Sequence, residues 1–220
     1  MIKLIQTTEE LFDERQKYTQ SKIGLVPTMG NLHEGHLSLV RASLQENDLT
    51  IVTIYVNPKQ FGPDEDYELY PRTLDQDLAR LETIEDESTK IIVFCPKNHQ
   101  QVYPTGFSTN IQILGVTKKL CGHKRPGHFD GVATVVYQLF SLTDAHQAYF
   151  GQKDYQQFKV IERMCKDLRL PIVLKMGKVI RDENGLALSS RNQYMTSAEY
   201  EKALTLPRTL KAIAYLLQNQ

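Results

Sequence analysis

Two histidines three positions apart, His33 and His36, have the residue types and spacing in this chain that most directly suggest chemistry. They follow an apolar run that ends at Val26 and a short segment in which proline and glycine break regular structure, and a helical pattern follows them. This order predicts a strand, a tight loop and a helix with both histidines at its start. Unpaired N–H groups and a partial positive charge make a helix N-terminus a natural site for phosphate. Two histidines on one helix face can both donate to such a ligand.

Gly35 lies between the two histidines and costs a helix about 1 kcal/mol relative to alanine. Its presence indicates that some group approaches the backbone closely at this point. A plainer alternative is that both histidines are ordinary surface residues and that Gly35 belongs to a loop. The segment alone leaves both interpretations open.

Three more loops, at 57–62, 151–154 and 188–191, are expected to lie at the carboxyl ends of strands. They carry amides, a lysine, two serines and an arginine. In a parallel α/β sheet, ligands bind outside the carboxyl ends of the strands. We therefore expect these loops and the loop 27–36 to converge on one site.

The elements that must position these loops alternate between strand and helix patterns. The predicted strands are 22–26, 49–56, 90–95, 145–151 and 172–176, and the predicted helices are 8–20, 36–46, one from Thr73 capped with Gln76, 132–142, 155–168 and 197–218 with an interruption at Pro207. This pattern predicts an α/β fold with a Rossmann-like parallel sheet. We expect one domain over residues 1–175 and the start of a smaller C-terminal domain over 176–220.

Composition excludes several classes of protein. The 26 basic and 26 acidic side chains balance, so no bulk charge favours nucleic acid or a membrane surface. No apolar run approaches the roughly 20 residues that span a bilayer, and the N-terminus lacks the apolar core of a signal peptide. Three cysteines without CxxC spacing fit reduced thiols in the cytoplasm. Neither GxxxxGK[ST] nor GxGxxG occurs, so nucleotide binding would depend on the histidine segment.

The segment 33–36, HEGH, resembles the HxGH signature of the nucleotidylyltransferase superfamily, and the longer PTMGNLHEGH resembles the pantothenate synthetase (pantoate–β-alanine ligase) family in particular. VNPKQF at 56–61, GQKDYQQ at 151–157 and LSSR at 188–191 are similar to family segments in the same order. The resemblance implies that ATP and pantoate form a pantoyl-adenylate, which β-alanine then attacks to give pantothenate. It also implies Mg²⁺, small-molecule substrates and a homodimer formed through the N-terminal domain.

The resemblance also implies roles for individual residues. The catalytic residues would be His36, His33 and Lys153. The ATP-binding residues would be Met29, Gly30, Asn31, Leu32, His33, Glu34, Gly35, His36, Gly151, Gln152, Lys153, Asp154, Ile180, Leu188, Ser189, Ser190 and Arg191. Pantoate or β-alanine would contact Gln60, Gln157, Asn57, Pro27 and Met29, where amides suit a substrate with hydroxyl and carboxylate groups.

One acidic segment, after Tyr-Pro-Arg-Thr, and one basic segment, around Arg125 and His128, each have two competing interpretations. In family members, acids after the Tyr-Pro-Arg-Thr segment help to hold magnesium, which implies Asp77 as a metal ligand. The alternative is a solvated helix N-terminus whose acids complement the helix dipole. Arg125 and His128 lie in a segment similar to the family's RPGHF and could add positive potential over phosphates. The alternative for that segment is a structural loop that ends at a helix cap, Asp130.

The chain also departs from the family pattern. Gln152 stands where family members usually have glutamate, and family members usually continue well past residue 220. These departures leave open a nucleotide-binding module without catalysis. A zinc hydrolase with His33 and His36 as ligands is a separate alternative, which lacks an obvious third ligand at a recognised spacing. A nucleotidylyltransferase with another acceptor is a third, and Gln60 and Gln157 count against it.

Overall fold

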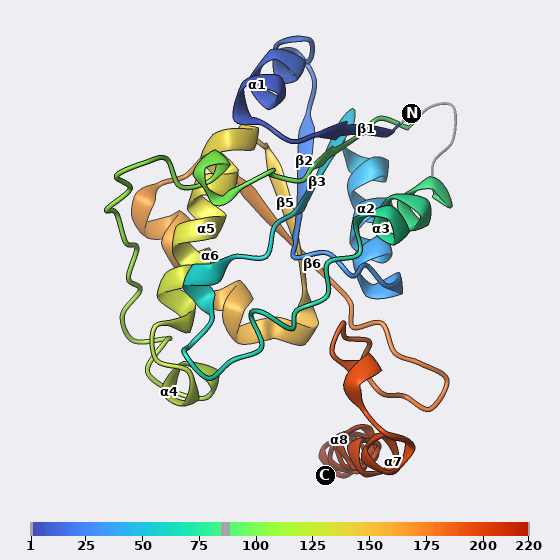
Figure 1. The fold of residues 1–220 in the computed structure, drawn as a ribbon. Coiled ribbons are helices and arrows are strands. Elements are labelled where there is room, and N and C mark those ends of the chain that lie inside the picture. Colours follow the sequence, from blue (N-terminus) through green and yellow to red (C-terminus); the bar gives the residue numbers. More distant parts are fainter. Residues whose placement is uncertain (1, 85–88, 220) are drawn as a thin grey trace.

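A parallel sheet of six strands forms the centre of the molecule (Figure 1). The computed structural model describes residues 2–84 and 89–219. The strands are β1 (Ile2–Ile5), β2 (Ile23–Thr28), β3 (Leu49–Ile54), β4 (Ile91–Phe94), β5 (Gln147–Gly151) and β6 (Val173–Gly177), in the order β1-β4-β3-β2-β5-β6. Every pair is parallel. The predicted α/β class is confirmed.

Helices cover both faces of the sheet (Figure 1). The helices are α1 (Thr8–Gln16), α2 (Glu34–Glu46), α3 (Leu74–Glu82), α4 (Cys121–Lys124), α5 (His128–Thr143), α6 (Tyr155–Leu168), α7 (Ser197–Ala203) and α8 (Thr205–Gln218), with short 3₁₀ turns η1 (Pro58–Gln60), η2 (His99–Gln101), η3 (Gln152–Asp154) and η4 (Asn192–Tyr194). Helices α1, α5 and α6 pack on one face, and α2 and α3 pack on the other.

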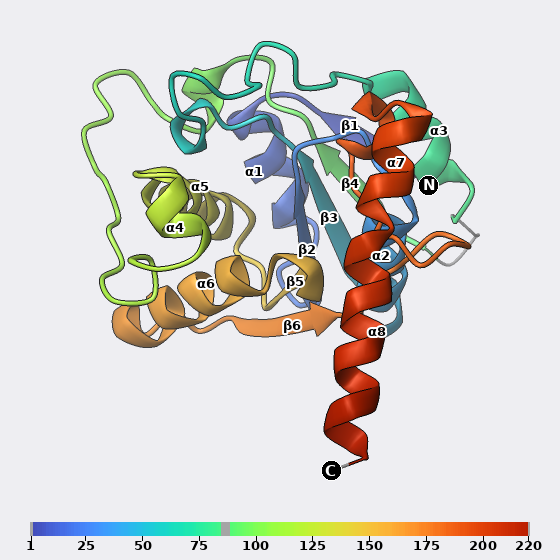
Figure 2. The same cartoon turned by 90° about the horizontal axis from the view of Figure 1, so that it is seen from below.

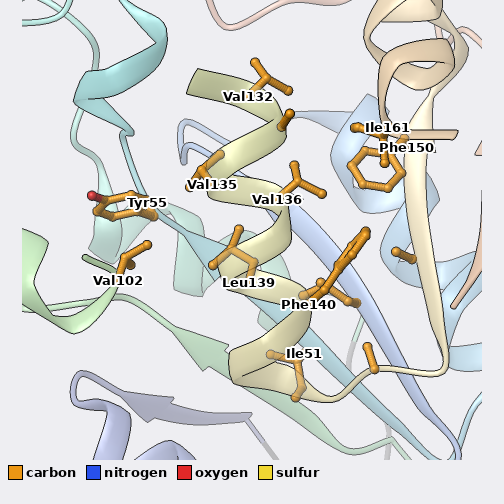
Figure 3. Close-up of a cluster of buried hydrophobic side chains, with 14 of the residues drawn as sticks. Ile51, Tyr55, Val102, Val132, Val135, Val136, Leu139, Phe140, Phe150 and Ile161 are labelled. Carbon is orange, nitrogen blue, oxygen red and sulfur yellow. The ribbon is translucent and has the colours of Figure 1, made fainter. Parts of the chain in front are cut away.

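The four central strands, β2, β3, β4 and β5, are buried on both faces because they are largely apolar. All six residues of β3 are buried, and its side chains alternate between the two cores, with Ile51 in one and Val52 in the other. Helix α5 supplies much of the larger core, and its apolar side chains lie between β3 and Phe150 of β5 (Figure 3). This packing fixes the carboxyl ends of the strands, from which the loops of interest emerge.

The order of the strands reverses at β2. From β2 the chain adds β3 and β4 on one side and then β5 and β6 on the other. β2 pairs with β3 over six residues, whereas it pairs with β5 only at Gly24 and Leu25. The two strands therefore separate toward their carboxyl ends, which is the usual place for a ligand crevice in this architecture.

Several predicted element boundaries are wrong. Strand β1 was not expected; it is an edge strand of four residues that pairs with β4 from Ile2↔Ile91 onward. Thr73 makes no side-chain capping bond to α3. The break in the last helix falls at Leu204 rather than at Pro207, which lies in the first turn of α8, where a missing N–H costs little. Helix α5 begins at His128 after a left-handed Gly127 (φ +79°), so Asp130 is not its cap.

The C-terminal segment beyond the sheet lies beside the loops at the carboxyl edge, and α8 extends away from the sheet (Figure 2). β6 continues to Gly177, two residues past the predicted domain boundary at 175. Residues 1 and 220, the outer limits of the two predicted domains, lie outside the described residues. No helix within residues 2–84 and 89–219 is long and apolar enough to cross a lipid bilayer.

Candidate active site

The two histidines orient each other at the start of α2. His33 is the N-cap, and its Nδ1 accepts the backbone N–H of Gly35 at 3.1 Å. His36 is the third helical residue, and its Nδ1 accepts the backbone N–H of His33 at 3.2 Å. The ring centroids lie 4.1 Å apart. Because Nδ1 is an acceptor in both rings, the proton of each neutral ring is on Nε2, which is left to donate to a ligand.

Burial keeps both rings neutral. It lowers the pKa of His33 to about 4, with the positive charges of Lys153 and Arg80 adding to the effect. Burial lowers the pKa of His36 to about 3, with His33 and then Lys153 as further causes. At neutral pH the pair therefore offers two hydrogen-bond donors and no net charge.

The group that approaches Gly35 closely is the ring of His33. A Cβ atom on Gly35 would lie 2.7 Å from Cε1 and 2.9 Å from Nδ1 of that ring. Since such contacts are far inside van der Waals distance, any side chain at position 35 would displace the ring. The expected close approach is confirmed, and it comes from within the motif.

The loop before α2 is anchored by Asp77 of α3. Its Oδ2 accepts the backbone N–H of Asn31 at 3.0 Å and its Oδ1 accepts that of Leu32 at 2.6 Å. The carboxylate is only 1% exposed, and burial raises its pKa against the lowering effect of these bonds. Gly30 and Asn31 adopt φ of +83° and +49°, so the carboxylate holds a tight left-handed turn.

This geometry differs from both sequence interpretations of Asp77. The side chain is not at a solvated helix end, and both of its oxygens already accept backbone N–H groups. Among residues 2–84 and 89–219, no group of three or more His, Cys, Asp or Glu is arranged to hold a metal ion. The same finding counts against a zinc hydrolase. Because Nδ1 of each histidine accepts a backbone N–H, the neutral ring carries its proton on Nε2 and has no free lone pair for zinc.

Two amide side chains, those of Asn57 and Gln60, form part of the cavity wall. The buried Asn57, just before η1, donates to Oε1 of Gln60 at 3.1 Å and to the carbonyl of Gly131 at 3.1 Å. Nε2 of Gln60 points toward Sδ of Met29 at 3.1 Å, and sulfur is a weak acceptor. The NH₂ group of Gln60 can therefore still donate to a ligand, whereas the side chain of Asn57 is hydrogen-bonded to protein groups.

Lys153 lies in η3, at the carboxyl end of β5, and Gln157 lies in the first turn of α6. Both residues line the same cavity, although they belong to different elements. Nζ of Lys153 forms an ion pair with Asp154 at 3.0 Å. Because this pair is largely exposed, a phosphate can compete for the lysine at small cost.

The loop 188–191 docks directly on the loop before α2. Nδ2 of Asn31 donates to the carbonyl of Ser190 at 3.2 Å, and the hydroxyl of Ser190 donates back to the carbonyl of Asn31 at 3.1 Å. Arg191 makes a bidentate ion pair with Asp66 at 2.7 and 2.8 Å and lies over the ring of Tyr70. Two motifs 159 positions apart thus form one rim of the site.

Arg125 and His128, the basic residues predicted to add positive potential over phosphates, also line the cavity. Arg125 is paired with Glu65, with Nη2 at 2.5 Å from Oε2. His128 contacts the carbonyl of Gln60 through Nδ1 at 2.8 Å, and since a carbonyl only accepts, that nitrogen carries the proton. Both residues therefore brace the turn that bears Gln60, and the charge of Arg125 is balanced by Glu65.

A cavity of about 250 Å³ lies where these loops meet. Most predicted site residues line it: Pro27, Met29, His33, Gly35, His36, Asn57, Gln60, Gly151, Lys153, Asp154, Gln157, Ile180, Leu188, Ser189, Ser190 and Arg191. Gly30, Asn31, Leu32, Glu34, Gln152 and Asp77 are not among its lining residues. The predicted convergence of the four loops is confirmed.

The apolar wall of the cavity was not predicted from the sequence. It consists of residues that also belong to the cores, chiefly Val132, Val135, Val136 and Leu139 of α5. Their spacing at 132, 135, 136 and 139 is the ordinary signal of a buried helix face, so periodicity alone does not distinguish a core stripe from a pocket wall. Lys178 and Val179, after β6, were also missed.

The site can be compared with known proteins. The model of the pantoate-beta-alanine ligase family matches residues 1–220. The chain belongs to this family. Its activity is accordingly the ATP-dependent ligation of pantoate and β-alanine.

Individual members agree with this assignment. The pantothenate synthetase of Thermotoga petrophila is 46% identical over 220 residues, which cover 99% of this chain and 77% of that protein. The enzyme of Pseudothermotoga lettingae is 49% identical over 219 residues, 100% of this chain and 75% of that protein.

Solved structures agree as well. A pantothenate synthetase from Thermus thermophilus superimposes with a TM-score of 0.91 at 43% identity, over 99% of this chain and 76% of that one. The pantoate-beta-alanine ligase from Francisella tularensis, complexed with beta-gamma ATP and β-alanine, superimposes with a TM-score of 0.87 at 36% identity, over 96% of this chain and 80% of that one.

Proposed function

We propose that this ligation proceeds in two steps through a pantoyl-adenylate, with the chemistry centred on the histidine pair. A carboxylate oxygen of pantoate attacks the α-phosphorus of ATP, and the bond to pyrophosphate breaks. The amine of β-alanine then attacks the acyl carbon, loses a proton, and releases AMP. Both steps need positioning and charge stabilisation rather than a protein nucleophile. The single observation that carries the proposal is the pair of oriented Nε2 donors at the helix N-terminus in the cavity.

His33 and His36 stabilise negative charge as it grows on the phosphate oxygens. They are neutral donors with fixed tautomers, so they need no proton transfer to act. Lys153, on the neighbouring strand end, supplies the positive charge that the pair lacks. Its partner Asp154 is exposed beside it, and we propose that the lysine moves from this carboxylate to the phosphates when ATP binds.

Pantoate lies between the amides and the apolar wall. Gln60 and Gln157 donate to its carboxylate and hydroxyl oxygens, since both line the cavity. The two methyl groups of pantoate need an apolar surface, and Val132, Val136 and Leu139 supply one there. Asn57, which was also predicted to contact substrate, holds Gln60 in place.

ATP lies along the rim formed by the loop before α2 and the loop 188–191. Ser189, Ser190 and Ile180 line the same cavity. We propose that Mg²⁺ arrives as the counter-ion of the ATP phosphates, which is how this ion is commonly bound. That proposal fits the donor set, because Asp77 is committed to the loop.

We propose a homodimer, which the family resemblance implies. Apolar side chains at both sheet edges, Leu4 at 40% exposed and Val173 at 54%, are available for contacts.

We propose the cytoplasm as compartment, since Cys95, Cys121 and Cys165 are all free thiols. We propose that residues after Gly177 begin a second domain that closes on the site, as the contact between Asn31 and Ser190 suggests.

Oxygen labelling tests the adenylate step. Pantoate carrying ¹⁸O in its carboxylate should transfer one labelled oxygen to AMP, because that oxygen bridges carbon and phosphorus in the intermediate. Mass spectrometry of the nucleotide product measures this transfer. Label that appears in inorganic phosphate together with ADP, or that is released as water with none in AMP, would overturn the proposal.

A further inference from the structure

A buried tyrosine outside the cavity touches the residue that holds Gln60. The hydroxyl of Tyr103 donates to Oδ1 of Asn57 at 2.8 Å, across 46 positions of sequence. The tyrosine is 8% exposed and is not among the cavity-lining residues. Burial raises the pKa of its hydroxyl, so the group stays a protonated donor at any physiological pH.

The orientation of the Asn57 amide is set by the backbone. Oδ1 also accepts the N–H of Lys59 at 3.2 Å, and Nδ2 donates to the carbonyl of Gly131 at 3.1 Å. A backbone N–H can only donate and a carbonyl can only accept. The amide therefore cannot be turned over, and its NH₂ group must be the one that faces Gln60.

The orientation of Asn57 determines which end of the Gln60 amide faces the cavity. Because the NH₂ group of Asn57 faces it at 3.1 Å, Gln60 must present Oε1 to Asn57 and Nε2 to the cavity. The Nε2 group has only the sulfur of Met29 as a partner in the described structure. The cavity thus receives a donor, which suits the carboxylate and hydroxyl oxygens of a ligand, and not an acceptor, which would repel them.

We propose that Tyr103 is a positioning residue for pantoate, which acts through Asn57 to hold the donor end of Gln60 toward the substrate. The inference rests on the proposed contact between Gln60 and pantoate. Its basis is that the bond from Tyr103 is the shortest of the four hydrogen bonds at Asn57. Without it, Oδ1 keeps only the 3.2 Å bond from Lys59, so the amide keeps its orientation but is held less tightly in place.

The direct test is Tyr103→Phe in the full chain, which removes one oxygen and keeps the ring against Phe107 and Lys59. The KM for pantoate should rise about tenfold, the effect of one net buried hydrogen bond. The KM for ATP should not change, and kcat should stay within about twofold. Tyr67→Phe is the matched control, because it removes a hydroxyl that contacts His99 instead and should leave all three constants unchanged.

A double-mutant cycle separates positioning from general destabilisation. Gln60→Ala alone should raise the KM for pantoate, and adding Tyr103→Phe to it should produce little further change, because both act through the same amide. If the hydroxyl had only a structural role, the increases in the KM for pantoate in the two single variants would multiply in the double variant.

The outcomes are distinguishable. If Gln60→Ala raises the KM for pantoate while Tyr103→Phe does not, or if the two effects multiply, the inference about Tyr103 is overturned and the proposed pantoate contact stands. If Gln60→Ala leaves the KM for pantoate unchanged, the proposed contact itself fails, and the role of Tyr103 fails with it.

Discussion

The backbone N–H of His33 donates to Nδ1 of His36 at 3.2 Å, so the first histidine of the motif fixes the tautomer of the second. His33 is fixed in turn by the N–H of Gly35. Each ring uses one nitrogen to complete the helix N-terminus and leaves the other to donate. The cap of the helix and the donors of the site are thus the same two side chains.

The first prediction concerns pH and stability. Both histidines have a native pKa far below the ordinary 6.5, so between these values the unfolded chain binds more protons than the native one. The histidine contribution to the free energy of unfolding is therefore complete above about pH 6.5 and is lost as pH falls through about 4 for His33 and about 3 for His36. Urea unfolding at pH 5 and pH 7 measures it.

His33→Asn is the matched control for that experiment. Asparagine keeps an N-cap acceptor but does not titrate. The stability of the parent should fall more steeply between pH 7 and pH 5 than that of the variant, and shared carboxylate effects cancel in the comparison. Parallel curves would show that His33 titrates normally in the native state.

Gly35→Ala should separate activity from stability. Alanine gains about 1 kcal/mol in helix propensity over glycine, but its Cβ would lie 2.7 Å from Cε1 of His33 and displace the ring. We expect kcat/KM to fall by about 10², with a midpoint of thermal unfolding near that of the parent. Gln45→Ala, on the exposed side of the same helix, should change neither. A fully active Gly35→Ala would contradict the role of the ring position.

Asp77→Asn tests anchor against metal ligand. One carboxylate oxygen becomes an NH₂ group that faces the N–H of Asn31 or Leu32, which should cost about 1–3 kcal/mol of stability. The Mg²⁺ concentration that gives half-maximal activity should not change. A shift of that concentration by about tenfold, with stability unaffected, would restore Asp77 as a metal ligand.

Asn31→Gly tests the link between the two nucleotide loops. Glycine tolerates the φ of +49° at this position but cannot donate to the carbonyl of Ser190. We expect the KM for ATP to rise about fivefold, and we expect limited proteolysis near residues 188–192 to become faster. Asn31→Ala should add a stability loss from its strained backbone. If Asn31→Gly is cleaved and binds ATP like the parent, the loops act independently.

Much of the fold was predictable because its signals are local. Strands β2 to β6 are apolar runs followed by loops with glycine, proline or polar residues, and the whole length of α6 was predicted correctly. The missed strand β1 is short and pairs with β4, about 90 positions away. Pairing over that distance leaves no periodic signal in a four-residue segment.

Cavity-lining residues were predictable where residue type and spacing indicate chemistry, as for His33, His36 and Lys153. Residues that act through a distant partner were not predictable. The carboxylate of Asp77 and the hydroxyl of Tyr103 act on loops 45 and 46 positions away. Sequence could show that Asp77 is acidic and near a helix start, but only folding brings its oxygens to the two N–H groups.

Release of pyrophosphate in a single turnover tests the central claim most directly. The chain is mixed with ATP, Mg²⁺ and pantoate in the absence of β-alanine. We predict about one pyrophosphate per site only when pantoate is present, AMP only after β-alanine is added, and a loss of about 10²–10³ in rate for His36→Ala. Pyrophosphate release that does not need pantoate, or that begins only when β-alanine is added, would contradict the adenylate account.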